Sequence, residues 1–199
     1  MATPAWSAYD EAYLQAYQWA GALAGGAALP QEQPTIQLGP GEVEHSRFPG
    51  VVVAGFFGEN KEYHKGFLLV GGPVGLALTG AASAARNAAK KAEAERAAVP
   101  HWHTLGPADV VLTNQRLVLL INGELQSLWH AESSPLQSAV GAHGVPAVEL
   151  QPNNMPPLRL EFAWAPLLYV FTHHLLDGQP PAAPLPEGLL ERAQAEGRM

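Results

Sequence analysis

The chain has 199 residues, with 18 acidic against 11 basic side chains, a formal net charge of -7 and no cysteine. This charge balance argues against nonspecific nucleic-acid binding, because such binding draws its affinity from Lys and Arg at phosphates. The lack of cysteine excludes disulfides, thiolate nucleophiles and cysteine-based zinc sites.

The N-terminal stretch has the pattern of an amphipathic helix over residues 5–24. An aromatic stripe recurs at helical spacing: Trp6, Tyr9, Tyr13 and Tyr17. We therefore expect a helical segment over 1–29 that packs on the sheet or docks on a partner or membrane surface. The first basic residue is Arg47, so the charged start of a secretory signal is missing. The expected location is the cytoplasm, with attachment to the inner face of the membrane as an alternative.

A polar, proline-flanked linker over 30–35 separates this helix from the folded domain, which is expected to begin at Ile36. Residues 42–45 are expected to form an opening strand. Residues 51–57, VVVAGFF, have the β-branched and aromatic composition of a buried strand. After a turn, residues 62–70 are expected to return as a further strand.

Residues 66–85 run for twenty positions without a charge, which is the length of a membrane span. Proline and glycine within this stretch oppose a simple spanning helix, because Pro costs a helix interior ~3 kcal/mol and each Gly ~1 kcal/mol. The favoured interpretation is an Ala-rich helical insertion over 71–98, and a membrane-inserted hairpin is the alternative. Its basic side chains form either a solvated helix face or a contact for phosphate or lipid: Arg86, Lys90 and Lys91.

His101 and His103 precede the central hairpins. On a strand they share one face, with the geometry of a paired metal ligand. A metal-dependent hydrolase is therefore one hypothesis, although the sequence supplies no evident general base beside them. The simpler interpretation is a pair of structural histidines, and we expect no catalytic residue, metal or cofactor.

Residues 109–130 give the clearest pattern in the chain, three short strands with two tight turns. The apolar runs lie at 110–112 and 117–121, and residues 124–130 alternate between two faces. The turns are expected at Asn114-Gln115 and Asn122-Gly123, and the second pair is a strong hairpin signal. This stretch predicts an antiparallel sheet.

Further strands are expected at 136–140, 145–150 and 158–162. Pro166 then opens an apolar helix ended by Asp177-Gly178, which is suited to cover an open end of a sheet. The Pro-rich tail over residues 179–199 is expected to be flexible, with a short helix at 189–195.

Three stretches between Ile36 and Gly178 carry a family resemblance: GEVEH at 41–45, VVLTNQRLVLL at 110–120 and LRLEFAWAPLLYVFTHHLLDG at 158–178. The order of elements resembles the pleckstrin-homology (PH) superfold, in particular bacterial PH-like and GRAM-like domains. This resemblance implies an α+β fold, an antiparallel β-barrel or sandwich of about seven strands with a C-terminal capping helix. The N-terminal helix and the Ala-rich insertion would be additions to it, and the domain would span 36–178.

No paired catalytic constellation is evident, so we expect a non-catalytic module that binds a protein or peptide. The expected site is a sheet edge or the groove beside the closing helix. The alternative is a membrane-associated module anchored through residues 66–91, and a second alternative is a hydrolase that uses His101 and His103. The sequence leaves the ligand and the oligomeric state open.

Overall fold

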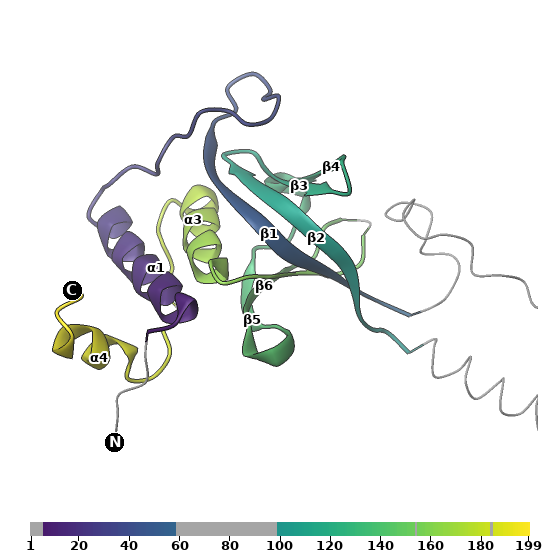
Figure 1. Cartoon of the computed structure of the whole chain (residues 1–199). Helices are drawn as coiled ribbons and strands as arrows, with labels where there is room; N and C mark the ends of the chain where they lie inside the picture. The colour runs from purple at the N-terminus through teal and green to yellow at the C-terminus, as the bar shows by residue number, and fades with distance from the viewer. Residues whose placement is uncertain (1–5, 59–98, 154, 184) are drawn as a thin grey trace, which may run out of the picture.

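The computed structural model describes residues 6–58, 99–153, 155–183 and 185–199. Within these ranges seven strands form one antiparallel sheet, and three α-helices gather at one end of the molecule (Figure 1). The strands are β1 (Glu44–Phe57), β2 (His101–Thr113), β3 (Arg116–Ile121), β4 (Glu124–Trp129), β5 (Gln137–Val140), β6 (Pro146–Leu150) and β7 (Leu158–Glu161). The helices are α1 (Ala8–Ala24), α3 (Ala165–Asp177) and α4 (Leu189–Ala195).

The strand order in the sheet is β4-β3-β2-β1-β7-β6-β5. Strands β1 to β4 form one meander and β5 to β7 form a second, and the pairing of β1 with β7 joins them. The expected α+β class and the antiparallel sheet are therefore confirmed. The edge strands β4 and β5 do not pair with each other in the described part of the chain, so the expected closed barrel is not confirmed.

Both predicted tight turns are confirmed. Asn114 and Gln115 separate β2 from β3, and Asn122-Gly123 separates β3 from β4. Asn122 has φ 51° and Gly123 has φ 86°, which are the left-handed conformations that a two-residue hairpin turn with the right twist requires. Local turn chemistry thus fixes the register of this meander.

Strand β1 differs from the sequence prediction, because the strands expected at 42–45 and 51–57 belong to one element. An irregularity in its pairing with β2 lies between Phe48 and Val51 and absorbs Pro49-Gly50, and Gly50 takes φ +69°. Phe48 is buried and its ring lies 5.3 Å from that of Phe162. The packing of Phe48 in the core therefore keeps residues 44–57 in one strand, although Pro49-Gly50 interrupts its regular pairing.

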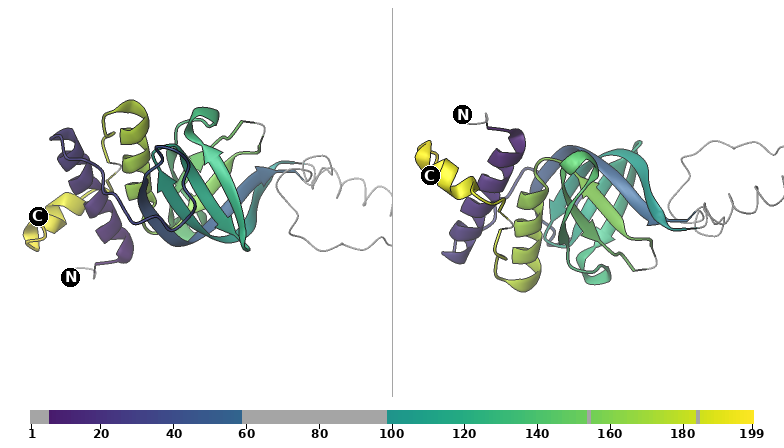
Figure 2. Two further views of the ribbon diagram at one scale, coloured as in Figure 1. Left: turned by 90° about the horizontal axis from the view of Figure 1, so that it is seen from above. Right: turned by 90° about the horizontal axis from the view of Figure 1, so that it is seen from below.

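The hydrophobic core lies between the sheet and α3, where Leu168 is fully buried and Phe171 nearly so. Helix α1 packs on α3, which lies between α1 and the sheet (Figure 2). Ala12 and Ala16 are fully buried, and Trp19 meets Phe171 edge to face at 5.2 Å. The sequence predicts that this helix packs on the sheet, but in the structure it packs on α3.

The C-terminal tail ends in α4, a short helix with the bounds expected from the sequence. Leu189 and Ala193 of α4 are buried, and α4 contacts α1. Arg192 and Arg198 lie over the ring of Trp6 at 4.3 and 4.5 Å. These contacts join the two ends of the polypeptide.

The strand expected at 62–70, the helical insertion at 71–98 and the basic residues Arg86, Lys90 and Lys91 lie outside the described residues. Among the helices of the described ranges, none combines the length and the apolar character needed to cross a bilayer.

Candidate functional site

Each arginine in the described part of the chain faces a carboxylate. The pairs are Arg47–Asp109, Arg116–Glu42, Arg159–Glu149, Arg192–Asp10 and Arg198–Glu11. No lysine lies within the described ranges. These five guanidinium groups are therefore already neutralised, and none is left unpaired to bind an anionic ligand.

The most buried of these pairs joins Arg116 to Glu42, whose side chain has no exposed surface. Arg116 Nε donates to Glu42 Oε1 at 2.7 Å, and the Thr113 hydroxyl donates to the same oxygen at 2.8 Å. The Gly39 N–H donates to Glu42 Oε2 at 2.7 Å. Burial alone would raise the pKa of Glu42, but the hydrogen bonds from Arg116, Gly39 and Thr113 outweigh it and lower the pKa to about 2.

A second buried carboxylate, Glu44, fixes the segment that the sequence predicts as a linker. It accepts hydrogen bonds from the Thr35 backbone N–H and hydroxyl, both at 2.8 Å. The Glu32 N–H also donates to the Glu44 carbonyl at 2.9 Å. Residues 32–35 are thus bonded to the start of β1, and both buried carboxylates have structural roles.

The far ends of β1 and β2 carry aromatic side chains that leave the core. Phe56 pairs with Trp102 across the two strands, with ring centroids 5.2 Å apart. Phe56 is 37% exposed, although the sequence predicts a buried strand through this residue. Arg159 of β7 lies over Trp102 at 3.9 Å, so a cation–π contact holds the indole in place.

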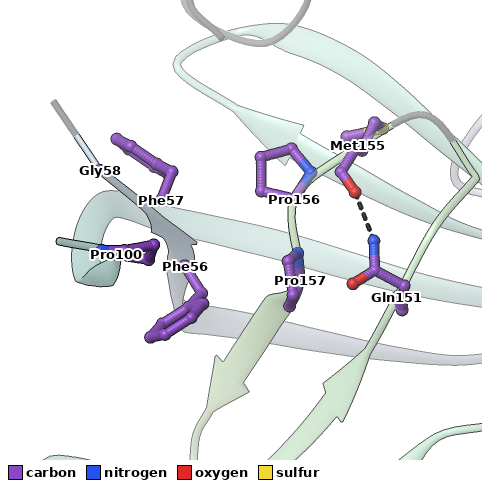
Figure 3. A pocket seen from close by; sticks show the side chains of 8 residues that line it. All are labelled: Phe56, Phe57, Gly58, Pro100, Gln151, Met155, Pro156 and Pro157. Atoms are coloured by element: carbon purple, nitrogen blue, oxygen red, sulfur yellow. Dashed lines mark hydrogen bonds between the residues drawn. The ribbon is translucent and has the colours of Figure 1, made fainter. Parts of the chain in front are cut away.

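A hollow of about 490 Å³ opens beside these rings (Figure 3). Its walls come from the end of β1, the start of β2 and the loop between β6 and β7: Phe56, Phe57, Gly58, Pro100, Gln151, Met155, Pro156 and Pro157. The Phe56 N–H donates to the Pro157 carbonyl at 2.9 Å, which extends the pairing of β1 with β7 to the rim. The Gln151 amide donates to the Met155 carbonyl and closes the loop.

The rings and prolines form one aromatic–proline surface, which we define by Phe56, Phe57, Pro100, Trp102, Pro156 and Pro157. The side chains that line the hollow are apolar except for the Gln151 amide. Such a surface can bind an apolar segment.

His101 and His103 share one face of β2, as the sequence predicts, and their ring centroids lie 3.9 Å apart. One nitrogen of each ring faces a backbone carbonyl: His101 Nδ1 lies 3.0 Å from the Val99 oxygen and His103 Nε2 lies 2.9 Å from the Phe57 oxygen. The His103 ring also stacks on Phe57 at 4.2 Å. Among the described residues, no His, Asp or Glu joins the two histidines to make a group of three metal ligands.

The aromatic–proline surface is not among the sites that the sequence predicts. The available signal was the Pro156-Pro157 pair beside a strand, together with two aromatic residues at the last positions of VVVAGFF. Strand composition alone does not distinguish a ring that enters the core from one that passes beyond its edge.

Comparisons with known proteins give no further guidance, since no protein-family model, no curated protein and no solved structure matches the chain. The candidate site therefore stands on its sequence and geometry. Of the site residues predicted from the sequence, His101 and His103 lie together at the start of β2, and the others fall outside the described ranges.

Proposed function

We propose that this chain is a non-catalytic interaction module of the PH-like superfold, and that it binds an apolar, extended segment of a protein partner on the aromatic–proline surface. The strand order supports the superfold assignment, because a four-stranded meander is followed by a three-stranded meander and then by the closing helix α3. In this proposal the two meanders are the walls of a PH-like sandwich, and α3 covers one open end.

The observation that carries the binding proposal is a set of large rings outside the hydrophobic core. Phe56, Phe57 and Trp102 do not belong to the buried core cluster between the sheet and α3. Aromatic side chains are enriched at binding hot spots, because each covers a large contact area at a small cost in side-chain entropy. The prolines of the opposite wall further reduce the conformational entropy lost on binding, because their backbone is already restricted before a ligand binds.

Charge supports an apolar ligand over an anionic one. Arg159, the arginine that lies over Trp102, is held by the carboxylates of Glu149 and Glu161. Recognition of phosphate or a lipid headgroup at this surface would need an unpaired cation there, and Arg159 is not one. The membrane alternative depends on residues 66–91, which lie outside the described part, and no observation of the described part favours it.

The first prediction concerns Phe56→Ala in the full-length protein. Partners captured by the wild-type protein are purified, and their affinity is measured by calorimetry. We expect roughly tenfold to thirtyfold weaker binding for the variant, since loss of a hot-spot aromatic costs about 2 kcal/mol. Tyr9→Ala is the matched control, because Tyr9 is 39% exposed on α1, and it should bind as the wild type does.

Equal affinity of wild type and Phe56→Ala for every captured partner would refute the proposed site. A thermal melt of both variants shows whether each is folded before binding is compared. Sedimentation with anionic vesicles tests the membrane alternative separately, and vesicle binding that Phe56→Ala leaves unchanged would favour that alternative.

A further inference from the structure

Strand β4 ends the sheet on one side, and the hairpin that contains it determines which of its backbone groups are free. In a two-residue hairpin the residues that flank the turn bond to each other, so Glu124 faces β3 across from Ile121. His130 also faces the preceding chain, because its N–H donates to the Gln115 carbonyl at 3.0 Å. Backbone groups along a strand alternate in direction, and Glu124 and His130 both belong to the inward-facing set. It follows that Leu125, Ser127 and Trp129 point their N–H and C=O groups outward, along the open edge.

The side chains of these three residues form a pattern that is symmetric about Ser127. Leu125 is 58% exposed and Trp129 is 39% exposed, and both lie on the same face as Ser127. Ser127 is small, and its hydroxyl accepts a hydrogen bond from Arg116 at 2.7 Å. A large apolar side chain thus stands two residues to either side of a small central one.

In the described part of the chain, strand β4 itself carries none of three features that commonly protect edge strands from pairing, namely proline, lysine and a bulge. Its six residues, ELQSLW, include no proline and no lysine, and its pairing with β3 has no bulge. The opposite edge strand, β5, has four residues, and α3 lies against it. Of the two edges, β4 is the one against which no helix of the described ranges is packed.

We propose that β4 pairs antiparallel with β4 of a second copy of this chain, with Ser127 on the twofold axis. Ser127 then lies opposite its own counterpart, where two identical side chains must fit together, and a serine leaves room and can hydrogen-bond. Leu125 of each copy lies opposite Trp129 of the other. The pairing joins the two sheets into one through the outward N–H and C=O groups of three residues in each chain.

The same register avoids repulsion between two acidic proteins. Glu124 lies opposite His130 of the other copy, and Gln126 lies opposite Leu128. No carboxylate faces a carboxylate across the strand pair, and like charges in that position would be destabilising. A shift of one residue would move the twofold axis away from Ser127 and end the Leu–Trp pairing on both sides, so the side chains select this register.

The test uses single-cysteine variants. Because the sequence contains no cysteine, a disulfide between two copies can form only through the introduced residue. In the proposed dimer the two Cα atoms of position 127 lie about 5.5 Å apart, within the range that a disulfide spans. Ser127→Cys in the full-length protein should therefore form a covalent dimer on mild oxidation. Val140→Cys, at an exposed position of β5, is the matched control and should not.

A second variant keeps the proposal testable if Ser127→Cys disturbs the fold. Leu125→Lys changes a side chain that is largely exposed in one chain, but it removes the apolar partner of Trp129 twice in the dimer. Sedimentation equilibrium of the wild type should give a species of twice 21.1 kDa at high concentration. Leu125→Lys should raise the dimer dissociation constant roughly tenfold.

Either of two results would overturn the proposal. One is a wild-type protein that sediments as a 21.1 kDa monomer at every concentration studied. The other is a dimer that Leu125→Lys does not weaken and that cross-links as readily through position 140 as through position 127. Because β4 contributes no residue to the aromatic–proline surface, failure of this proposal leaves the proposed function untouched.

Discussion

Glu42 is the carboxylate whose ionisation the fold depends on most directly. Its folded pKa of about 2 lies below the ordinary value of 4.5, because hydrogen bonds to Arg116, Gly39 and Thr113 outweigh the effect of burial. A depressed carboxylate pKa stabilises the folded state fully above pH 4.5, and this contribution is lost as the pH falls from 4.5 toward 2. The shift corresponds to about 3 kcal/mol.

Glu42→Gln should therefore lower the free energy of unfolding by about 2–4 kcal/mol at pH 7, because a nearly buried Arg116 loses its charged partner. The variant should also lose the part of the stability change between pH 4.5 and pH 2 that Glu42 contributes. Urea denaturation over a pH series measures both effects. Glu124→Gln is the control, since this exposed carboxylate has no charged partner among the described residues, and an equal response of the two variants would contradict the prediction.

The sequence indicates where turns and strands lie but not which polar residues are buried. Asn122-Gly123 could be assigned because a turn is a local choice of backbone conformation. The sequence predicts Glu42 and Glu44 in an opening strand but not their burial, since that burial depends on Arg116 and Thr35, which lie elsewhere in the chain. A hydrogen-bond partner distant in sequence leaves no local signal.

For helix α1, the sequence likewise predicts the element but not which of its side chains are buried. Its aromatic stripe predicts the packing face, yet Tyr9 and Tyr17 are exposed, and the fully buried side chains of α1 include Ala12 and Ala16. Small side chains allow two helices to approach closely, and the gain in dispersion contacts can exceed what a few partly buried tyrosines provide. The periodicity therefore predicts the helix correctly, but it predicts the wrong set of buried side chains.

The contact between α4 and α1 depends on Arg192, which forms an ion pair with Asp10 at 2.6 Å and lies over Trp6. Arg192→Ala should release α4 and speed amide hydrogen exchange in residues 189–195 about tenfold, since the ion pair and the cation–π contact together contribute about 1–2 kcal/mol. Exchange in β2 and β3 should be unchanged. Glu191→Ala, at an exposed neighbouring position, should leave α4 protected, and equal exchange in both variants would contradict this role of Arg192.

The domain boundary at Ile36 expected from the sequence can be tested on shortened chains. A chain of residues 36–178 lacks Thr35, so the buried Glu44 loses two hydrogen-bond donors. A chain of residues 30–178 keeps them, and both chains lack α1 and α4 equally. We expect the shorter chain to be less stable by about 1–3 kcal/mol in urea denaturation. Equal midpoints would show that residues 30–35 are a linker, as their composition predicts.

For the molecule as a whole, the sequence predicts most of the elements and the α+β class, because short-range patterns determine them. The strands at 136–140, 145–150 and 158–162 and the helix from Pro166 appear within two residues of their expected bounds. The candidate site was not predictable in this way. It brings together the end of β1, the start of β2 and the loop before β7, and only the pairing of β1 with β7 makes them neighbours.

The contacts of Arg192 and Arg198 with the ring of Trp6 hold the first and last described segments of the chain together, which matters for anything covalently attached to this protein. The described chain begins and ends at one pole, beside α1 and α4, while the end of β1 and the start of β2 lie at the other end of the described fold (Figures 1 and 2). A fluorophore, a bead or a neighbouring polypeptide joined at Met199 is therefore attached at the opposite end of the described fold from Phe56 and Trp102. The protein can be immobilised or labelled there without a direct contact between the attachment and these rings.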